Sequence, residues 1–142
     1  MEIIVTGHGN FASGIESTVK LLAGSIKNVK YINFTEGMGE EDLMQDFQKA
    51  IESDKHIVFF CDLLGGTPYK QAAVISTKSD KDISVVCGCN VGALLENGLT
   101  GIDKFTDSVE LANSLIKSTK QGIKLFGMSN HTNATEPLSD GI

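Results

Sequence analysis

The sequence of 142 residues contains no arginine and no tryptophan, and it has only 2 prolines. The lack of arginine removes the bidentate guanidinium clamp with which many enzymes hold phosphate or carboxylate substrates. All 12 basic side chains are lysines, and 18 acidic side chains bring the formal net charge to −6. Because nucleic acids and anionic membranes need a dense cationic face, we expect neither as a partner.

Long apolar runs and a cysteine framework are also missing. No run approaches the ~18 residues of a membrane-spanning helix, and no basic segment precedes the apolar residues 3–5, so we expect no signal peptide. The 3 cysteines, Cys61, Cys87 and Cys89, do not suit a secreted disulfide scaffold, which favours a cytoplasmic protein. Their spacing is unusual for zinc, so we interpret them as buried thiols and expect neither metal nor cofactor.

Apolar runs alternate with segments of helical periodicity, and 41% of the residues are hydrophobic, enough for one buried core. Short connections between such segments favour right-handed strand–helix–strand units. We therefore predict an α/β fold with a doubly wound, mainly parallel open sheet and helices on both faces. The strands are expected at residues 3–5, 29–34, 57–61 and 83–86, with a short last strand at 123–126. The domain is expected over residues 1–127, followed by a flexible polar tail at 128–142 that contains His131.

Two loops carry the residues that could do chemistry. The first strand ends in Thr6-Gly7-His8-Gly9-Asn10, and the third is followed by Asp62. An open parallel sheet binds its ligands at the carboxyl ends of its strands, so these loops flank one crevice if the two strands are neighbours. Flanking glycines would leave the imidazole of His8 open. If Asp62 accepts a hydrogen bond from Nδ1–H of His8, then Nε2 is left bare as a nucleophile.

Gly65, Gly66 and Thr67 precede a predicted helix that begins near Pro68. Unpaired N–H groups and the positive end of the helix dipole could hold a phosphoryl group there without any arginine. Thr67 could cap the helix, add a hydroxyl to the phosphate, or do both. Each feature alone is commonly structural, and only their coincidence at one crevice favours a function. His56 opens the third strand at the opposite edge of the sheet, and we interpret it as structural.

These loops resemble the enzyme IIA domain of the mannose family of the bacterial phosphoenolpyruvate-dependent sugar phosphotransferase system. The resemblance rests on Val5-Thr6-Gly7-His8-Gly9, on Phe60-Cys61-Asp62-Leu63-Leu64-Gly65-Gly66-Thr67-Pro68, and on Gly88-Cys89-Asn90-Val91. It covers residues 1 to about 126 in matching order of elements. The combination of G-H-G with D-x-x-G-G-[ST]-P is specific, whereas either half alone is not.

The resemblance implies a phosphotransferase that works through a phosphohistidine. His8 would accept a phosphoryl group on Nε2 from phospho-HPr and pass it to a histidine of the IIB component, through which alone the chain would meet a membrane permease. Asp62 would orient His8, and Gly66 and Thr67 would lie beside the phosphoryl group. The resemblance also implies a homodimer in which the last strand, here residues 123–126, is exchanged.

Because both protein partners must reach His8, we expect exposed apolar residues around it, with Phe11, Met38, Leu63 and Leu64 as candidates. One alternative is the related phosphoryl carrier that feeds dihydroxyacetone kinase, which differs only in its acceptor. A non-catalytic flavodoxin-like binding module is the other alternative. A phosphohistidine phosphatase or mutase is rejected, because such sites need arginine.

Overall fold

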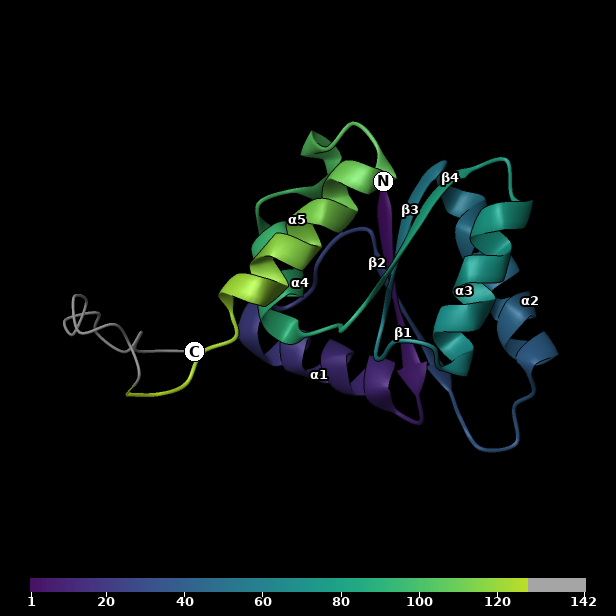
Figure 1. Ribbon diagram of the computed structural model, residues 1–142, viewed down its shortest axis with the longest axis horizontal. Helices are drawn as coiled ribbons and strands as arrows, with labels where there is room; N and C mark the ends of the chain where they lie inside the picture. Colours follow the sequence, from purple (N-terminus) through teal and green to yellow (C-terminus); the bar gives the residue numbers. More distant parts are fainter. Residues whose placement is uncertain (128–142) are drawn as a thin grey trace.

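Four parallel strands form one open sheet at the centre of the protein (Figure 1), and the computed structural model describes residues 1–127 of the chain. The strands lie in the order β2-β1-β3-β4, so β1 and β3 are neighbours at the centre. This arrangement confirms the predicted doubly wound parallel sheet. The strands are β1 (Glu2–His8), β2 (Val29–Phe34), β3 (His56–Cys61) and β4 (Asp82–Cys87).

Helices cover both faces of the sheet, as predicted. Figure 1 shows α1, α4 and α5 on one side of the strands and α2 and α3 on the other. Two short 3₁₀ turns, η1 (Ile51–Ser53) and η2 (Ile102–Lys104), complete the described elements. The helices are α1 (Phe11–Ala23), α2 (Glu40–Ala50), α3 (Thr67–Lys78), α4 (Val91–Leu99) and α5 (Ser108–Gln121).

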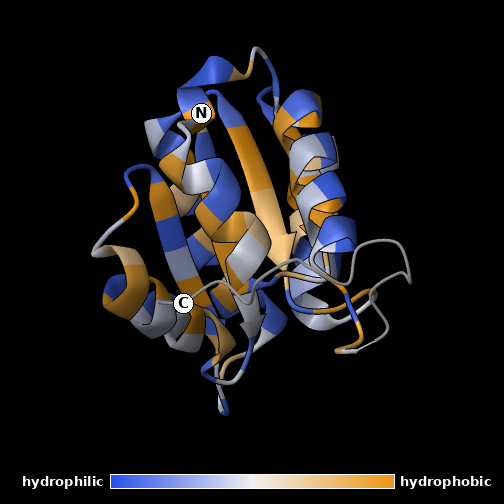
Figure 2. Cartoon of the chain, turned by 90° about the vertical axis from the view of Figure 1, so that its left-hand side faces the viewer, coloured by the Kyte–Doolittle hydropathy of each residue, from blue (hydrophilic) through white to orange (hydrophobic). Residues whose placement is uncertain are grey.

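The alternation of side chains along each central strand divides the core into two layers. In β1, Ile3 and Val5 pack under α1, α4 and α5, whereas Ile4 faces α2 and α3. In β3, Phe60 packs in the same layer as Ile3 and Val5, and Phe59 packs in the same layer as Ile4. Both faces of a parallel sheet are covered by helices, which explains why these strands are continuous apolar runs. In Figure 2 the central strand is coloured as hydrophobic along most of its length, and hydrophilic and hydrophobic residues alternate along the helices.

In the single chain, residues 123–126 do not form the predicted short strand, and the exchange of this strand in a homodimer stays a prediction. The segment follows α5 without regular structure, and Ile123, Leu125 and Phe126 are 75, 70 and 84% exposed. A short edge strand needs the backbone groups of a neighbouring strand, and within residues 1–127 this segment pairs with none. The predicted tail, residues 128–142, lies outside the described residues. None of the described helices is long and apolar enough to cross a membrane.

Candidate functional site

His8 and Asp62 lie together at the carboxyl edge of the sheet, where β1 and β3 end side by side. His8 is the last residue of β1, and Asp62 directly follows β3. The Nδ1 atom of His8 lies 2.7 Å from Oδ2 of Asp62. Since an ionised carboxylate only accepts hydrogen bonds, Nδ1 carries the proton of this bond, and in the neutral imidazole Nε2 has a free lone pair. The His8 side chain is 44% exposed, so this lone pair lies within reach of a partner.

The Asp62 carboxylate is held by three hydrogen bonds that all come from the site itself. Besides the imidazole, the backbone N–H of His8 donates to Oδ2 at 3.0 Å, and the backbone N–H of Leu63 donates to Oδ1 at 2.9 Å. Burial raises the pKa of Asp62, but hydrogen bonds from His8 and Leu63 outweigh burial and lower the pKa below its usual value. The carboxylate therefore stays ionised and keeps the imidazole in one tautomer at neutral pH.

Two glycines make this close arrangement possible. A Cβ atom on Gly7 would lie 2.8 Å from Cβ of Asp62 and 2.6 Å from Cδ1 of Phe11. Gly7 therefore makes room for the side chains of Asp62 and Phe11 beside the end of β1. A Cβ on Gly66 would lie 2.5 Å from Cε1 of His8, so the backbone of the β3–α3 loop lies directly against the ring.

The N-terminus of α3 lies on the Nε2 side of the imidazole. A Cβ on Gly66 would be 3.2 Å from Nε2, and Gly66 is also the N-cap residue of α3. The first N–H groups of a helix have no partner within it, and those of Thr67 and Tyr69 are two of them. Gly65 turns into this helix with φ 79°, a left-handed value that favours glycine. These groups offer an anion a set of backbone donors beside Nε2.

Thr67 differs from one of its predicted roles. It is the first residue of α3 and provides no side-chain cap, because Gly66 occupies the N-cap position. The capping interpretation is therefore wrong, and the hydroxyl is left for the second predicted role, a bond to phosphate. Gly66 replaces a capping side chain here because any Cβ at this position would collide with His8.

Phe34 is a residue of this site that the sequence analysis missed. It ends β2 and is the register partner of His8 in β1. Its ring lies edge-on to the imidazole, with 6.0 Å between the ring centroids and 72° between the planes. The signal was present in the sequence: β2 was predicted to end at this residue, and parallel strands bring their carboxyl ends to the same edge.

The four residues predicted around His8 divide into two groups. Leu63 and Leu64, in the β3–α3 loop, are 49 and 71% exposed. Phe11 and Met38 are half-buried and pack against the two core clusters. The exposed apolar surface next to His8 therefore consists mainly of Leu63 and Leu64. Phe11 and Met38 are instead partly packed against the core.

The buried cysteines and an apolar surface groove have no direct part in this arrangement. Cys61 and Cys89 are buried, and burial raises the pKa of the Cys61 thiol to about 12, which leaves it protonated and unreactive. Within residues 1–127, no three His, Cys, Asp or Glu side chains are grouped to hold a metal ion. An apolar groove of about 580 Å³ between α1 and α4 includes Leu22, Leu95 and Leu99 but neither His8 nor Asp62.

Comparisons with known proteins agree on one family. Residues 2–123 match the family described as PTS system fructose IIA component. The PTS system sorbose-specific EIIA component of Lacticaseibacillus casei is 30% identical over 138 residues, which cover 96% of this chain and 98% of that protein. The PTS system fructose-specific EIIA component of Bacillus subtilis is 27% identical over 99 residues, covering 68% of this chain and 67% of that protein.

A solved structure extends the similarity to three dimensions. The phosphotransferase system component EIIA from Streptococcus agalactiae superposes with a TM-score of 0.83. The two chains are 36% identical, and the superposition covers 88% of this chain and 96% of that one. The sequence comparison and the structural comparison therefore indicate the same family over nearly the whole described part of the chain.

Proposed function

Because the chain belongs to the PTS system fructose IIA component family, a family of phosphotransfer proteins of sugar uptake, we propose that it carries a phosphoryl group on Nε2 of His8. The donor is phospho-HPr, and the acceptor is a IIB component of the same system. The observation that carries the proposal is the 2.7 Å hydrogen bond between Nδ1 of His8 and Asp62, which leaves Nε2 bare. The reduced state of the buried thiols fits a cytoplasmic protein.

The transfer needs no proton at the attacking atom. The Nε2 lone pair forms a bond to phosphorus while the bond between phosphorus and the donor's ring nitrogen breaks, and that nitrogen leaves with the bonding electrons. The His8 ring then carries positive charge, which the Asp62 carboxylate stabilises through the proton on Nδ1. Transfer to the acceptor runs the same steps in reverse.

The surroundings of Nε2 suit a group that is held briefly. The phosphoryl oxygens would meet backbone N–H groups at the start of α3, with the Thr67 hydroxyl beside them. The sequence has no arginine, so no bidentate guanidinium contact can trap the group. A carrier must release what it binds, and donors of moderate strength serve both steps.

A transfer assay tests this proposal. The chain is mixed with enzyme I, HPr and labelled phosphoenolpyruvate, and the label on the chain is followed with and without a IIB component. We expect His8→Ala to remove all label and His56→Ala, the matched control with similar exposure, to leave labelling within about twofold of the wild type. The adduct should be acid-labile, as a phosphohistidine is. Labelling that survives His8→Ala would contradict the proposal, and a wild type that takes no label would favour the binding-module alternative.

The exposed leucine pair supports a docking role at the same site. Leu63 and Leu64 lie in the loop that joins Asp62 to the start of α3, so a partner that reaches His8 would cover them. Exposed apolar side chains beside a reactive group are typical of an interface core. We expect Leu64→Asp to weaken docking of phospho-HPr, seen as a raised half-saturation concentration of HPr in the same assay.

We also propose that two copies form a homodimer by exchanging residues 123–126. β4 is an edge strand, and its outer backbone groups lack a strand partner within residues 1–127. A groove of about 330 Å³ runs beside it between α3 and α5, lined by Tyr69, Val85 and Ile116 among others. An exposed apolar segment such as residues 123–126 of a second copy would fill this groove and complete the sheet.

Sedimentation of the full chain tests the dimer. We expect the wild type to sediment as a dimer and Phe126→Asp to sediment as a monomer at micromolar concentration. Leu21→Asp is the matched control, because Leu21 is 86% exposed on α1 and lies outside the groove beside β4. A wild-type monomer, or a dimer that survives Phe126→Asp, would contradict strand exchange.

A further inference from the structure

Phe34 faces the imidazole of His8 from the side opposite to Asp62. β1 lies between β2 and β3, so His8 has Phe34 on its β2 side and Asp62 with Gly66 on its β3 side. The Phe34 ring is half-buried and meets the imidazole edge-on at 6.0 Å between centroids. The imidazole is therefore confined between two neighbouring strand ends.

The backbone of Phe34 also holds the turn that follows His8. Its carbonyl oxygen accepts a hydrogen bond from the N–H of Gly9 at 2.7 Å, and Gly9 adopts the left-handed value φ 57°. This bond depends only on the backbone and remains in any non-proline substitution. Changing the Phe34 side chain therefore removes the ring contact and leaves the turn in place.

The ring contact limits a motion that the hydrogen bond alone does not prevent. The imidazole can rotate about χ1 and, more freely, about χ2, and an exposed pair bridged by one hydrogen bond opens easily. On the β3 side the Gly66 backbone blocks the ring. On the β2 side the Phe34 ring meets the imidazole edge-on, so a smaller residue there would let the imidazole tilt away from Asp62.

We propose that Phe34 is a positioning residue that keeps Nδ1 of His8 on Asp62 and so keeps Nε2 unprotonated and aimed at the incoming phosphorus. This inference rests on the proposed phosphoryl transfer. When the ring tilts away, Nδ1 loses its acceptor, and the proton can move through water to Nε2, which then cannot attack. A displacement of about 1 Å at a reacting atom is enough to slow a positioned reaction strongly.

Three variants separate positioning from general packing. Phe34→Leu removes the aromatic ring, and we expect phosphoryl transfer to slow roughly tenfold. Phe34→Tyr keeps the ring and should restore transfer to within about twofold of the wild type. Ile32→Ala is the matched control, because Ile32 packs on the same core cluster from the same strand but pairs with Thr6 instead of His8.

The tautomer of His8 supplies a readout that packing alone would not change. In ¹H–¹⁵N spectra of the unphosphorylated protein we expect one tautomer, protonated at Nδ1, in the wild type, Phe34→Tyr and Ile32→Ala. Phe34→Leu should show a mixture with Nε2 protonated. A single unchanged tautomer in Phe34→Leu, or an equal mixture in Ile32→Ala, would overturn the inference. If the wild type takes no label from phospho-HPr, the proposed function fails, and these spectra still decide the role of Phe34.

Discussion

Two histidine–aspartate pairs lie at opposite ends of the same sheet, and their local geometries are nearly equal. Nδ1 of His8 lies 2.7 Å from Asp62, and Nδ1 of His56 lies 2.8 Å from Asp82. The two imidazole side chains are 44 and 43% exposed. A hydrogen-bonded, exposed histidine is therefore not enough to identify a phosphoryl carrier, and the difference must lie in what surrounds the pair.

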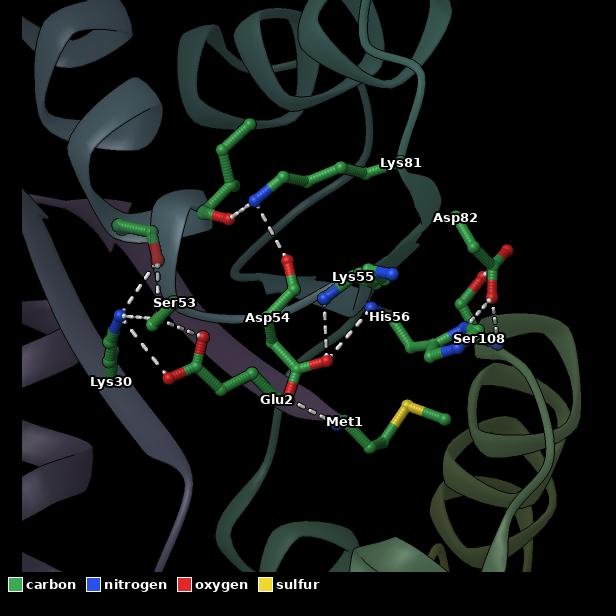
Figure 3. Close-up of polar contacts among 12 residues, drawn as sticks. Met1, Glu2, Lys30, Ser53, Asp54, Lys55, His56, Lys81, Asp82 and Ser108 are labelled. Carbon is green, nitrogen blue, oxygen red and sulfur yellow. Dashed lines mark hydrogen bonds and ion pairs between the residues drawn. The ribbon is translucent and has the colours of Figure 1, made fainter.

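The aspartates serve different neighbours. Within residues 1–127, Asp62 accepts hydrogen bonds from His8 and from the adjacent Leu63 alone, so this carboxylate mainly orients the histidine. Asp82 also accepts from the backbone N–H and the hydroxyl of Ser108, both at 2.7 Å, at the start of α5 (Figure 3). The second pair therefore joins β3, β4 and α5, which agrees with the structural role predicted for His56.

The helix N-termini beside the two pairs differ. A helix that directly follows a parallel strand starts at the carboxyl end of that strand, so α3 starts at the His8 end, whereas α5 runs the other way and starts beside Asp82. His8 therefore lies beside free N–H groups of α3. At the His56 end, the carbonyl oxygens of Ala50, Ile51 and Asp54 accept hydrogen bonds from Lys30 and Lys81 (Figure 3). The start of α3 has no side-chain cap and leaves its N–H groups to an anion, whereas Asp82 and Asp107 already accept from N–H groups at the start of α5.

The largest expected effect is the difference in phosphoryl-transfer rate between variants of the two aspartates. Asp62→Asn should slow phosphoryl transfer about 10³-fold, because an amide can donate to Nδ1 and place the proton on Nε2. Asp82→Asn should leave the rate within about twofold. Quenched-flow labelling with phospho-HPr measures both, and equal rates for the two variants would break the comparison.

A second test concerns the space beside the imidazole. Gly66→Ala places a methyl group 2.5 Å from Cε1 of His8, so the ring must move, and we expect transfer to fall about 10²-fold. Gly98→Ala is the control, since its methyl group meets Ile26 at 2.7 Å, away from both pairs. That variant should lose about 1–3 kcal/mol of unfolding free energy and keep its transfer rate. Normal transfer by Gly66→Ala would show that the close contact is unimportant.

The third prediction concerns stability at the other end of the sheet. Ser108 is fully buried, and its hydroxyl bonds to Asp82 at 2.7 Å. We expect Ser108→Ala to lower the unfolding free energy by about 1–2 kcal/mol, because the buried bond is lost. Urea denaturation followed by circular dichroism gives the value. A loss of phosphoryl transfer in the folded variant would contradict a purely structural second pair.

The smallest effect is a pH dependence of stability. Burial raises the pKa of Asp82, but hydrogen bonds from His56 and Ser108 lower it overall, and the pKa of Asp62 is lowered likewise. A folded pKa below the unfolded value stabilises the fold above the unfolded pKa of about 3.9, and this stability is lost as pH falls through the folded pKa. Urea titrations from pH 6 to about pH 2 should show a shallower loss in Asp82→Asn than in the wild type.

Much of the fold could be predicted from local pattern. The four strands and five helices follow from apolar runs and helical spacing, since burial against a two-sided sheet imposes those periods on the chain. The placement of His8 and Asp62 at one edge followed from the parallel topology. Residues 123–126 form no strand in the single chain, because an apolar run becomes a strand only where a neighbouring strand supplies backbone partners.

Local sequence patterns also failed to predict several contacts within the site, for a related reason. Gly7 was interpreted from its neighbour His8, yet its missing Cβ accommodates Asp62, which lies 55 residues along the chain. Thr67 was assigned a possible cap that Gly66 occupies, and Phe34 was seen only as the end of a strand. Contacts between distant residues depend on strand register and helix packing, which local periodicity does not contain.

The order of residues alone therefore determined the layered α/β architecture, the edge at which chemistry is possible, and the lack of any guanidinium to grip an anion. Only the tertiary structure decided which of two similar histidine–aspartate pairs lies beside a helix start without a side-chain cap. The physical reason is that the partners come from distant parts of the chain: Gly66 takes the N-cap position of α3 against the His8 ring, whereas Asp82 and Asp107 bond the first N–H groups of α5.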